Sequence, residues 1–591
     1  MKTGQRRAQM PERFACPDGW VRNRSLMAPG PTDAAVLTNF FPTATGARAR
    51  GGSTLYATLD AAVTHLATHS YRGADTLFAA TAESIYDITS PGSPGTPEVP
   101  LLTAFSSGEW ATQEFSTSGG GFTWWVNGTD NAALFNGTSL VPITDQATNA
   151  LNYDALVTDF ETGETVTGGT SGATAEIVGI RRTTATAGTL YIGTVTGGPF
   201  QNNEALTSAS GSATADGTVS VVLANTISGI EGSALSHVWT HGRRLWFVEE
   251  DTLSAWYLGP GAISGTLTEF PLDGVVSVGA VLMFGGRLST DANDGMDDFQ
   301  VFVTSEGEVA IYAGTDPSSA NTWALQGVYK IPRPLSKRAH ARVGGDLWIA
   351  TEAGLFSMLD VLSAQREQQV AVALTFDIED FWQDAVAARS TAVPFALGVW
   401  YSRTYLLIGI PGQADGQPLA LVLNTATRRW ALYVGWDART AVVHDDQLYF
   451  GTQTSLVLSA ETGGTDNGDA YYSTMVPMFR SGAPNLKYAH QSRVVYKGAG
   501  TPLLTILEDF DSSDIPLSDV YSISLGSLWG TAVWGTGIWG SPDDTVGQEW
   551  QATPGYGFSF SPALAVGWGS AANPSFEPAA IEVLYELGRE I

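Results

Sequence analysis

Two pairs of histidines are the first candidates for chemistry in this chain. His65 and His69 are four residues apart, and so are His237 and His241. On a helix this spacing would place two imidazoles on one face, where they could bind a metal ion. Both pairs lie in strand-like segments, VTHLATHSY and SHVWTHGRR, and neither has a third ligand nearby. We therefore expect core or surface histidines and assign no metal ligand.

Two clusters of acidic side chains could bind calcium or act as paired carboxylates in glycoside hydrolysis. Their spacing does not follow the order of a calcium-binding loop, and the separation of two carboxylates across a sugar bond cannot be derived from spacing. We therefore expect solvated turns at both places. The clusters are Asp291, Asn293, Asp294, Asp297 and Asp298, and then Glu508, Asp509, Asp511 and Asp514.

The short motifs of nucleotide and hydrolase chemistry are missing from the sequence. The chain has no Gly-Lys pair, so it has no GxxxxGK[ST] phosphate loop, and it has no GxSxG, HExxH or CxxC sequence. Residues 535–540 match GxGxxG, but no βαβ unit surrounds them, so we attribute the match to coincidence. We therefore assign no catalytic residue, cofactor or metal.

Any site in this chain must be positioned by a hairpin that recurs seven times. In each copy, Val, Ile, Leu, Phe, Tyr and Trp fill two strands, while small or charged residues occupy the turn between them. Such repetition is the signature of a radial β architecture, the β-propeller. Tryptophans within these strands, such as Trp124, Trp125, Trp246 and Trp348, are expected to lie in the core. The copies begin at Thr76, Phe122, Arg244, Phe299, Asp346, Thr404 and Gln447.

The spacing of the copies predicts an insertion in one blade. Successive starts are 46, 122, 55, 47, 58 and 43 residues apart. A four-stranded blade needs roughly 40 to 50 residues, and removing the 75 residues from 151 to 225 lowers the long interval to 47. This segment is internally duplicated, because Phe160 and Glu164 are echoed forty residues later by Phe200 and Glu204. We expect a small β module there.

These segments define the fold class as all-β. We expect a β-propeller of about six or seven blades, an inserted small β module and a C-terminal β-sandwich-like domain. One covering helix is expected over residues 376–388, where apolar residues recur near helical spacing. The predicted domains are a basic N-terminal arm and entry strand (1–54), the first blades (55–150), the inserted domain (151–225), the remaining blades (226–462) and a C-terminal β domain with a Trp/Gly-rich loop (463–591).

The arm and the Trp/Gly-rich loop hold the candidate assembly residues. An arm of this kind usually reaches a neighbour or stays disordered. In the loop GSLWGTAVWGTGIWG, the tryptophans are five residues apart, which suits neither one helix face nor one strand face. Glycine-relieved turns would let each indole insert into a pocket, in assembly, in gating or in internal packing. The assigned residues are Arg6, Arg7, Arg13, Trp529, Trp534 and Trp539.

Charge and composition narrow the possible partners. The formal net charge is −29, yet residues 1–50 carry eight basic and three acidic groups, a net charge of +5. The acidic remainder disfavours tight phosphate binding, although it allows nucleic acid to pass without sticking.

The single cysteine, Cys16, excludes an internal disulfide. No segment approaches the roughly 18 uninterrupted apolar residues of a membrane span.

Both ends of the chain resemble a known family. AAVLTNFFPTATGARARGGSTLYAT (34–58) and YRGADTLFAATAESIYDIT (71–89) are similar to the start of the propeller-bearing tail nozzle or hub proteins of short-tailed bacteriophages. FSFSPALAVGW through IEVLYELG is similar to their last strands. The resemblance covers about the first ninety and last forty residues. The insertion at 151–225 departs from it.

The resemblance implies a structural virion protein of the tail that is not an enzyme and is assembled in the host cytoplasm. Several copies, six in the family pattern, would form a tube below the portal and adaptor proteins, next to tail fibre or needle proteins. This tube would retain genomic DNA and conduct it at ejection, with like charge in the lumen lowering friction. The alternatives are a carbohydrate-binding or glycan-depolymerising phage tail protein, and a propeller scaffold or enzyme of cellular origin.

Overall fold

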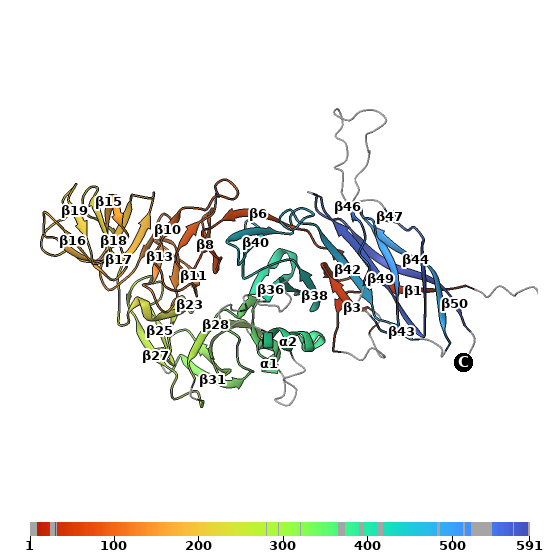
Figure 1. Cartoon of the computed structure of the whole chain (residues 1–591). Helices are drawn as coiled ribbons and strands as arrows, with labels where there is room; N and C mark the ends of the chain where they lie inside the picture. The colour runs from red at the N-terminus through yellow and green to blue at the C-terminus, as the bar shows by residue number, and fades with distance from the viewer. Residues whose placement is uncertain are drawn as a thin grey trace, which may run out of the picture.

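The computed structural model of the chain consists mainly of β-strands. Figure 1 shows three bodies in a row: a small barrel at one end, a group of small sheets in the middle and a sandwich at the other end. Each body is built from strands, as expected for an all-β fold. The structure describes all residues except 1–8, 24–29, 31, 279, 293–294, 320, 364–372, 389–394, 396, 411–417, 482–484, 512–514, 522–545, 571 and 589–591.

Seven small sheets follow one another along the described chain, and each contains one of the seven repeated hairpins as its second and third strands. Sheet 1 consists of β7 (His65–Tyr71), β8 (Ala74–Ala80), β9 (Ile85–Asp87) and β10 (Pro100–Leu102). Sheet 2 consists of β11 (Ala111–Thr117), β12 (Gly120–Val126), β13 (Ala133–Phe135) and β14 (Leu140–Pro142). Sheet 3 consists of β23 (Leu235–His241), β24 (Arg244–Glu249), β25 (Ser254–Tyr257) and β27 (Thr268–Pro271).

Sheets 4 to 7 continue the series. Sheet 4 consists of β28 (Leu282–Ala292), β29 (Gly295–Thr304), β30 (Glu308–Gly314) and β31 (Trp323–Lys330), and sheet 5 consists of β32 (His340–Val343), β33 (Asp346–Thr351) and β34 (Gly354–Ser357). Sheet 6 consists of β35 (Leu397–Trp400), β36 (Tyr405–Ile410), β37 (Leu419–Asn424) and β38 (Arg429–Val434). Sheet 7 consists of β39 (Thr440–His444), β40 (Gln447–Gly451), β41 (Leu456–Ala460) and β6 (Ser53–Thr58). The second strands β33 and β36 are buried along their whole length, which explains their unbroken apolar sequence.

The seven sheets contact one another in a closed cycle, through their first strands except at sheet 5, where β33 also takes part. β7 contacts β11, β11 contacts β23, and β23 contacts β28. β28 contacts β33 of sheet 5, β32 contacts β35, β35 contacts β39, and β39 contacts β7 again. We call these seven sheets the ring.

Tight turns connect the first two strands of several sheets. Arg72 and Gly73, Gly242 and Arg243, and the pair at 445–446 each form a two-residue loop in which both residues have positive φ. Turns of this type follow the right-handed twist of the flanking strands, so the hairpin closes without splaying. The small or charged residues of these turns, which precede the repeated hairpins, therefore have a defined conformational role.

The ring is closed by a strand from the N-terminal part of the chain. β6 pairs antiparallel with β41, from Thr58 opposite Leu456 to Ser53 opposite Ala460. The boundary placed at residue 54 falls inside this strand. The fourth strand of the last sheet thus comes from the segment that precedes the first sheet.

The insertion forms a closed barrel. Its strands pair in the cycle β15, β18, β17, β16, β19, β20 and back to β15, while β21 pairs with β15 from outside. The barrel has its own apolar cluster, which includes both echoed phenylalanines, Phe160 and Phe200. The strands are β15 (Thr148–Thr158), β16 (Thr165–Gly168), β17 (Thr174–Arg182), β18 (Gly188–Ile192), β19 (Ala205–Thr207), β20 (Ser212–Ala215) and β21 (Ser220–Leu223).

The two echoed glutamates of the barrel hold each other's loops. Glu204 accepts hydrogen bonds from the backbone N–H groups of Thr170 and Ser171, in the loop after β16. Glu164 accepts hydrogen bonds from Ser208 Oγ and from the N–H and Oγ of Ser210, in the loop after β19. The sequence duplication is therefore a structural duplication, with one carboxylate clasp for each copy.

The C-terminal body is a two-layer sandwich that includes strands from the start of the chain. β1 pairs with β50, and β3 pairs with β42. One layer contains β2 (Gly19–Trp20), β3 (Asp33–Thr38), β42 (Tyr471–Pro477), β43 (Arg480–Ser481), β45 (Leu503–Glu508), β46 (Val520–Tyr521) and β49 (Ser559–Trp568). The other contains β1 (Met10–Ala15), β44 (Lys487–Lys497), β47 (Val546–Gly547), β48 (Gln551–Gly557) and β50 (Glu577–Leu587).

The described part of the N-terminal segment is not the free or neighbour-binding arm that we expected. Phe14 of β1 is buried between the two layers, with its ring centroid 6.0 Å from that of Phe560. This apolar anchor and the backbone pairing with β50 hold the segment on its own chain. The hairpin of β4 (Phe40–Thr43) and β5 (Gly46–Ala49) extends the connection, because β5 contacts β50.

Few helices cover the sheets. The helix expected over residues 376–388 is present as the 3₁₀ turn η3 (Phe376–Ile378) followed by α2 (Glu379–Ala388). The buried Trp382 of α2 donates a hydrogen bond from Nε1 to the carbonyl of Thr351, which ends β33. The other short elements are η1 (Gly232–Ala234), α1 (Met358–Ser363), η4 (Tyr401–Arg403) and the paired strands β22 (Ile227–Ser228) and β26 (Gly265–Thr266).

One buried ion pair joins the ring to the sandwich. Arg50 has no exposed surface, and its two terminal nitrogens donate to Asp466 at 2.8 and 2.6 Å. The same guanidinium donates to Asn39 Oδ1 and to the carbonyl of Val434 at the end of β38, and it lies 3.9 Å from the ring centroid of Tyr471 in β42. Burial by itself would lower the pKa of Arg50, but the Asp466 carboxylate raises it, so the pair stays ionised.

We expect Arg50→Met to destabilise the protein by about 3–5 kcal/mol, because it leaves the Asp466 carboxylate buried without its partner. Chemical denaturation followed by tryptophan fluorescence measures the loss. Arg333→Met is the matched control: Arg333 pairs with Glu306 at 2.8 Å and both side chains are solvent-accessible, so a loss of about 1 kcal/mol or less is expected. Equal losses for the two variants would contradict this role for Arg50.

For the barrel, we expect Glu204→Gln to increase hydrogen exchange of the amides at residues 170 and 171. Burial raises the pKa of Glu204, but its hydrogen bonds to Ser171, Gln201 and Thr170 more than offset this and leave the pKa below its usual value. The carboxylate therefore stabilises the fold above its ordinary pKa of about 4.3, and this contribution is lost as pH falls through the lower folded value. The difference between wild type and variant should disappear in acid. Glu176→Gln, at an exposed position of β17, should behave as wild type.

Candidate functional site

A cavity of about 170 Å³ lies where the first strands of the ring sheets approach one another. Its walls come from β7, β11, β23, β32, β35 and β39, so six of the seven sheets contribute. Its polar lining comprises His65, Thr112, His237, Arg338, His340 and Thr440. We call it the axial cavity. It gathers the imidazoles of three different sheets in one place.

Arg338 is the only formally charged residue among those that line the axial cavity. It lies just before β32 and donates from Nη1 to the carbonyl of Thr64 and to Nδ1 of His65. Its Nε is buried and has no hydrogen-bond partner. Among the described residues, no carboxylate lies within ion-pair distance of this guanidinium. Burial lowers the pKa of Arg338 to about 10, which still leaves it cationic at neutral pH.

The imidazoles of the axial cavity are held neutral. Burial and the charge of Arg338 lower the pKa of His65 well below its usual value, and burial lowers the pKa of His340 to about 4. Burial, with His340 and Lys337 nearby, also lowers the pKa of His237. Because His65 Nδ1 accepts from Arg338, its proton is on Nε2, 3.1 Å from Thr112 Oγ1.

Two of these imidazoles have unused polar atoms. His237 is only 5% exposed, and Nδ1 of both His237 and His340 is buried without a partner. His340 stacks on Phe284, with ring centroids 4.2 Å apart and planes 10° apart, and its ring lies 5.2 Å from that of His237. The aromatic stack fixes the plane of His340, so its orphan nitrogen has a defined direction.

The axial cavity does not combine a carboxylate with its imidazoles. No Asp or Glu is among its lining residues, and the described residues contain no group of three or more His, Cys, Asp or Glu that could hold a metal ion. A nucleophile with an acid–base partner is therefore not assembled here. The axial cavity presents one guanidinium cation and several hydrogen-bonding nitrogens.

We expect the imidazole of His340 to titrate with a midpoint near pH 4, far below the roughly 6.5 of an unperturbed histidine. The unfolded chain takes up this proton at higher pH than the folded chain. The stabilising contribution of neutral His340 is thus present above pH 6.5 and is lost as pH falls towards 4. Imidazole proton chemical shifts, assigned with His340→Asn, measure the midpoint. A midpoint above 6 would contradict the burial argument.

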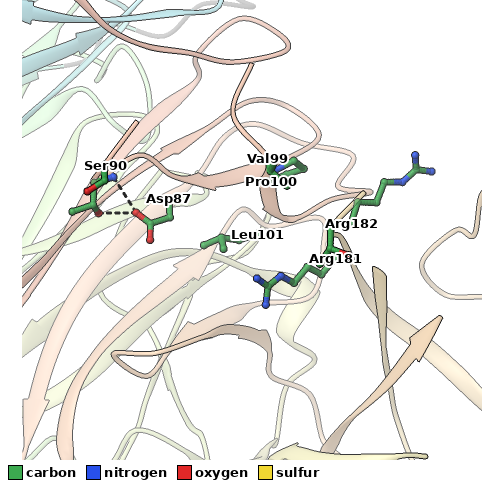
Figure 2. A pocket seen from close by; sticks show the side chains of 9 residues that line it. Asp87, Ser90, Val99, Pro100, Leu101, Arg181 and Arg182 are labelled. Atoms are coloured by element: carbon green, nitrogen blue, oxygen red, sulfur yellow. Dashed lines mark hydrogen bonds between the residues drawn. The ribbon is translucent and has the colours of Figure 1, made fainter. Parts of the chain in front are cut away.

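A second pocket, of about 420 Å³, lies at the junction of the barrel and the ring. Residues of β9 and β10 form one wall, and Arg181, Arg182 and Thr183 at the end of β17 form the other. Figure 2 shows the two arginines extending in opposite directions, and Arg182 pairs with Asp159 of the barrel. Asp87 accepts hydrogen bonds from the N–H and Oγ1 of Thr89 and so fixes its own turn.

The barrel is fastened to the ring beside this pocket. Thr103, after β10, donates from its N–H and its Oγ1 to the carbonyl of Ile180 at 2.8 and 3.2 Å. Asn131 donates to the carbonyl of Val178, and Val178 packs into the apolar cluster of sheets 1 to 3. Both partners lie on β17, which is therefore the docking strand of the barrel.

The histidine pairs lie on strands, as the sequence indicated. His65 and His69 are in β7, and His237 and His241 are in β23. Their four-residue spacing brings no pair together; instead His65 and His237 line the same cavity from different sheets. The four strand tryptophans, Trp124, Trp125, Trp246 and Trp348, are buried.

The acidic clusters lie in or beside turns. Asp291 is near the end of β28, opposite Met296 of β29 in register, and Asn293 and Asp294 fall outside the described residues. Glu508 accepts from the N–H of Tyr556, and Asp509 accepts from the N–H groups of Phe558 and Ser559. These carboxylates stabilise loops of the sandwich. Asp514 is not among the described residues.

Of the six residues assigned to assembly, the structure describes Arg13 alone. Arg13 is in β1, opposite Glu582 in register, with an exposed side chain. Arg6, Arg7, Trp529, Trp534 and Trp539 lie outside the described residues. The sequence analysis missed Arg338 and His340, because nothing along the chain marks the cavity where their sheets converge.

The fold and these sites define the chain, over its described residues, as an all-β protein of many small sheets with an inserted closed barrel. None of its described helices meets the length and hydropathy needed to cross a bilayer. No family model matches the sequence, and no curated protein matches it.

Solved structures are similar to the chain at low identity. The computationally designed protein Ika8 is 11% identical, covers 69% of this chain and 99% of its own, and has a TM-score of 0.31. YCF48 bound to D1 peptide is 11% identical, covers 69% and 97%, and has a TM-score of 0.25. The exo-β-1,3-galactanase of Phanerochaete chrysosporium is 9% identical, covers 58% and 94%, and has a TM-score of 0.22. At these TM-scores no activity is inferred from the similarity.

Proposed function

We propose that the protein is a structural component of a bacteriophage tail, a nozzle or hub subunit whose ring is a seven-bladed β-propeller. The observation that carries this proposal is the position of the two segments that resemble tail nozzle proteins. Residues 34–58 include β3 to β6, and the C-terminal segment includes β49 and β50. β3 and β49 flank β42 in one layer, and β5 contacts β50. Segments at opposite ends of the sequence thus build one body.

The joint between this body and the ring supports a mechanical role. β38 of sheet 6 pairs with β3 through Thr38 and Leu432, so the hydrogen-bonded sheet runs from the ring into the sandwich. Arg50 and Asp466 lie at the same joint. A part that retains DNA under pressure needs a stiff connection between its domains, and a continuous sheet with a buried ion pair provides one.

Three of the four basic residues that the structure describes in the N-terminal segment pair within the chain. Arg22 is 4.0 Å from Asp384, Arg48 is 3.2 Å from Glu461, and Arg50 binds Asp466. We therefore limit the proposed contact with an acidic neighbour to Arg13, among the described basic residues of β1 and its surroundings. The acidic body remains suited to a lumen along which DNA slides, because like charges repel.

In the proposed assembly, six copies form a ring below the portal and adaptor proteins, next to tail fibre or needle proteins, and genomic DNA passes through the lumen. The protein acts in the virion tail after assembly in the host cytoplasm, and it is not an enzyme. The glycan-binding alternative needs aromatic rings at the surface. The four strand tryptophans are buried, and the exposed rings that could serve it include Trp550, Tyr556 and Phe558 of the sandwich.

We expect purified protein mixed with its adaptor to form cyclic oligomers in native mass spectrometry and cryo-EM. Arg13→Glu should reduce the oligomer fraction by about tenfold, since reversing a rim charge at an interface costs on the order of 1–2 kcal/mol. Arg72→Glu is the matched control, because Arg72 is also exposed but lies at a ring hairpin. A protein that stays monomeric with adaptor and hydrolyses polysaccharide would overturn the proposal.

A further inference from the structure

We propose that the axial cavity is a binding site for a small oxyanion, with Arg338 as its charged anchor and His237 and His340 as hydrogen-bonding partners. The proposal rests on three buried polar atoms that have no hydrogen-bond partner: Arg338 Nε, His237 Nδ1 and His340 Nδ1. All three residues line the same cavity. The proposed oxyanion site is independent of the proposed role in a tail, because the site lies within one subunit.

The state of Arg338, whose side chain is partly buried, differs from that of the fully buried Arg50. The Arg50 guanidinium is neutralised by the Asp466 carboxylate and saturated with hydrogen bonds. The Arg338 guanidinium has no carboxylate partner among the described residues and keeps an orphan Nε. A buried cation without a counter-charge is costly, and an anion bound beside it removes that cost.

The charges around the cavity leave this cation available. The preceding residue, Lys337, is already paired with the carboxylate of Glu250 and so does not require an anionic ligand. Glu109 attracts Arg338 electrostatically, but it is exposed and is not among the lining residues. The nearest fixed charge in the cavity is therefore positive, whereas the protein as a whole has a net charge of −29.

The size and lining select a compact, polar anion. A volume of about 170 Å³ accommodates on the order of ten water molecules, enough for one tetrahedral or planar oxyanion with some water. Two imidazoles and one guanidinium can donate to its oxygens, and Thr112 and Thr440 add hydroxyls. Phosphate, sulfate and carboxylates share this acceptor chemistry. Chloride does not offer several acceptor oxygens and serves as the contrast.

Because the lining comes from six sheets, a bound anion should also hold the ring together. A ligand that binds only the folded state raises Tm, and for a chain of this length the rise is about 1 °C for each tenfold increase in concentration above Kd. We expect inorganic phosphate to bind the full-length protein with a Kd of about 1 mM or lower in isothermal titration calorimetry. Sulfate should compete, and chloride at equal ionic strength should not.

Arg338→Gln should weaken phosphate binding at least about tenfold and abolish the phosphate-dependent rise in Tm. Arg333→Gln is the matched control: it removes the same charge five residues earlier, at an exposed position that pairs with Glu306, and should bind as wild type. His237→Asn, which leaves Arg338 intact, should weaken binding by a smaller factor. Arg338→Lys should restore part of the affinity if charge is the anchor.

Three results would overturn the proposal. The first is wild-type protein that shows no phosphate heat and no shift in Tm at 10-fold the expected Kd of about 1 mM. The second is equal loss of binding in Arg338→Gln and Arg333→Gln, which would mean that only overall charge matters. The third is an equal effect of chloride and phosphate, which would mean screening. Acetate distinguishes a carboxylate ligand from a phosphate or sulfate ligand: tighter binding of acetate than of phosphate identifies a carboxylate as the preferred anion.

Discussion

The buried pair of Arg50 and Asp466 is the interaction on which the arrangement of this protein depends. A guanidinium with no exposed surface must have every donor satisfied, or the cost of removing it from water is not offset. Its partners come from the N-terminal hairpin region, the end of β38, and the linker before the sandwich. The segments of Arg50 and Asp466 cannot move apart without leaving a charge unpaired, and movement of β38 would break the hydrogen bond from Arg50 to Val434. The geometry of ring and sandwich is therefore fixed by electrostatics as well as by packing.

The middle of the molecule depends on a different constraint, the closed cycle of contacts among the ring sheets. Small differences between the sheets are absorbed at the outer strands, where sheet 5 has three strands and sheet 6 continues into the sandwich. The inner strands have no such freedom, and their side chains must share the space that remains. Neutral imidazoles are suited to that position, because they hydrogen-bond without adding charge repulsion to a crowded interior.

The sequence predicts the local parts of this structure well and the distant contacts poorly. Every repeated hairpin is present, because apolar strands and turn residues encode a hairpin within about fifteen residues. The duplication at Glu164 and Glu204 indicated a compact insertion, but only coordinates show that each carboxylate holds the other copy's loop. The basic N-terminal segment suggested an arm, because its ion-pair partners cannot be recognised from the neighbouring sequence. The partners of Arg48 and Arg50 lie about 410 residues further along the chain. Composition carries no information about such distant pairs.

The closing strand β6 has a consequence for biosynthesis. During translation, Ser53–Thr58 leaves the ribosome early, but its partner strand β41 is made about 400 residues later. The nascent chain must carry an open sheet edge through most of its synthesis, and β1 waits even longer for β50. Both β6 and β1 thus find their partners only after the distant strands β41 and β50 have been synthesised. A truncated product, lacking either late strand, would expose the edges that complete chains conceal.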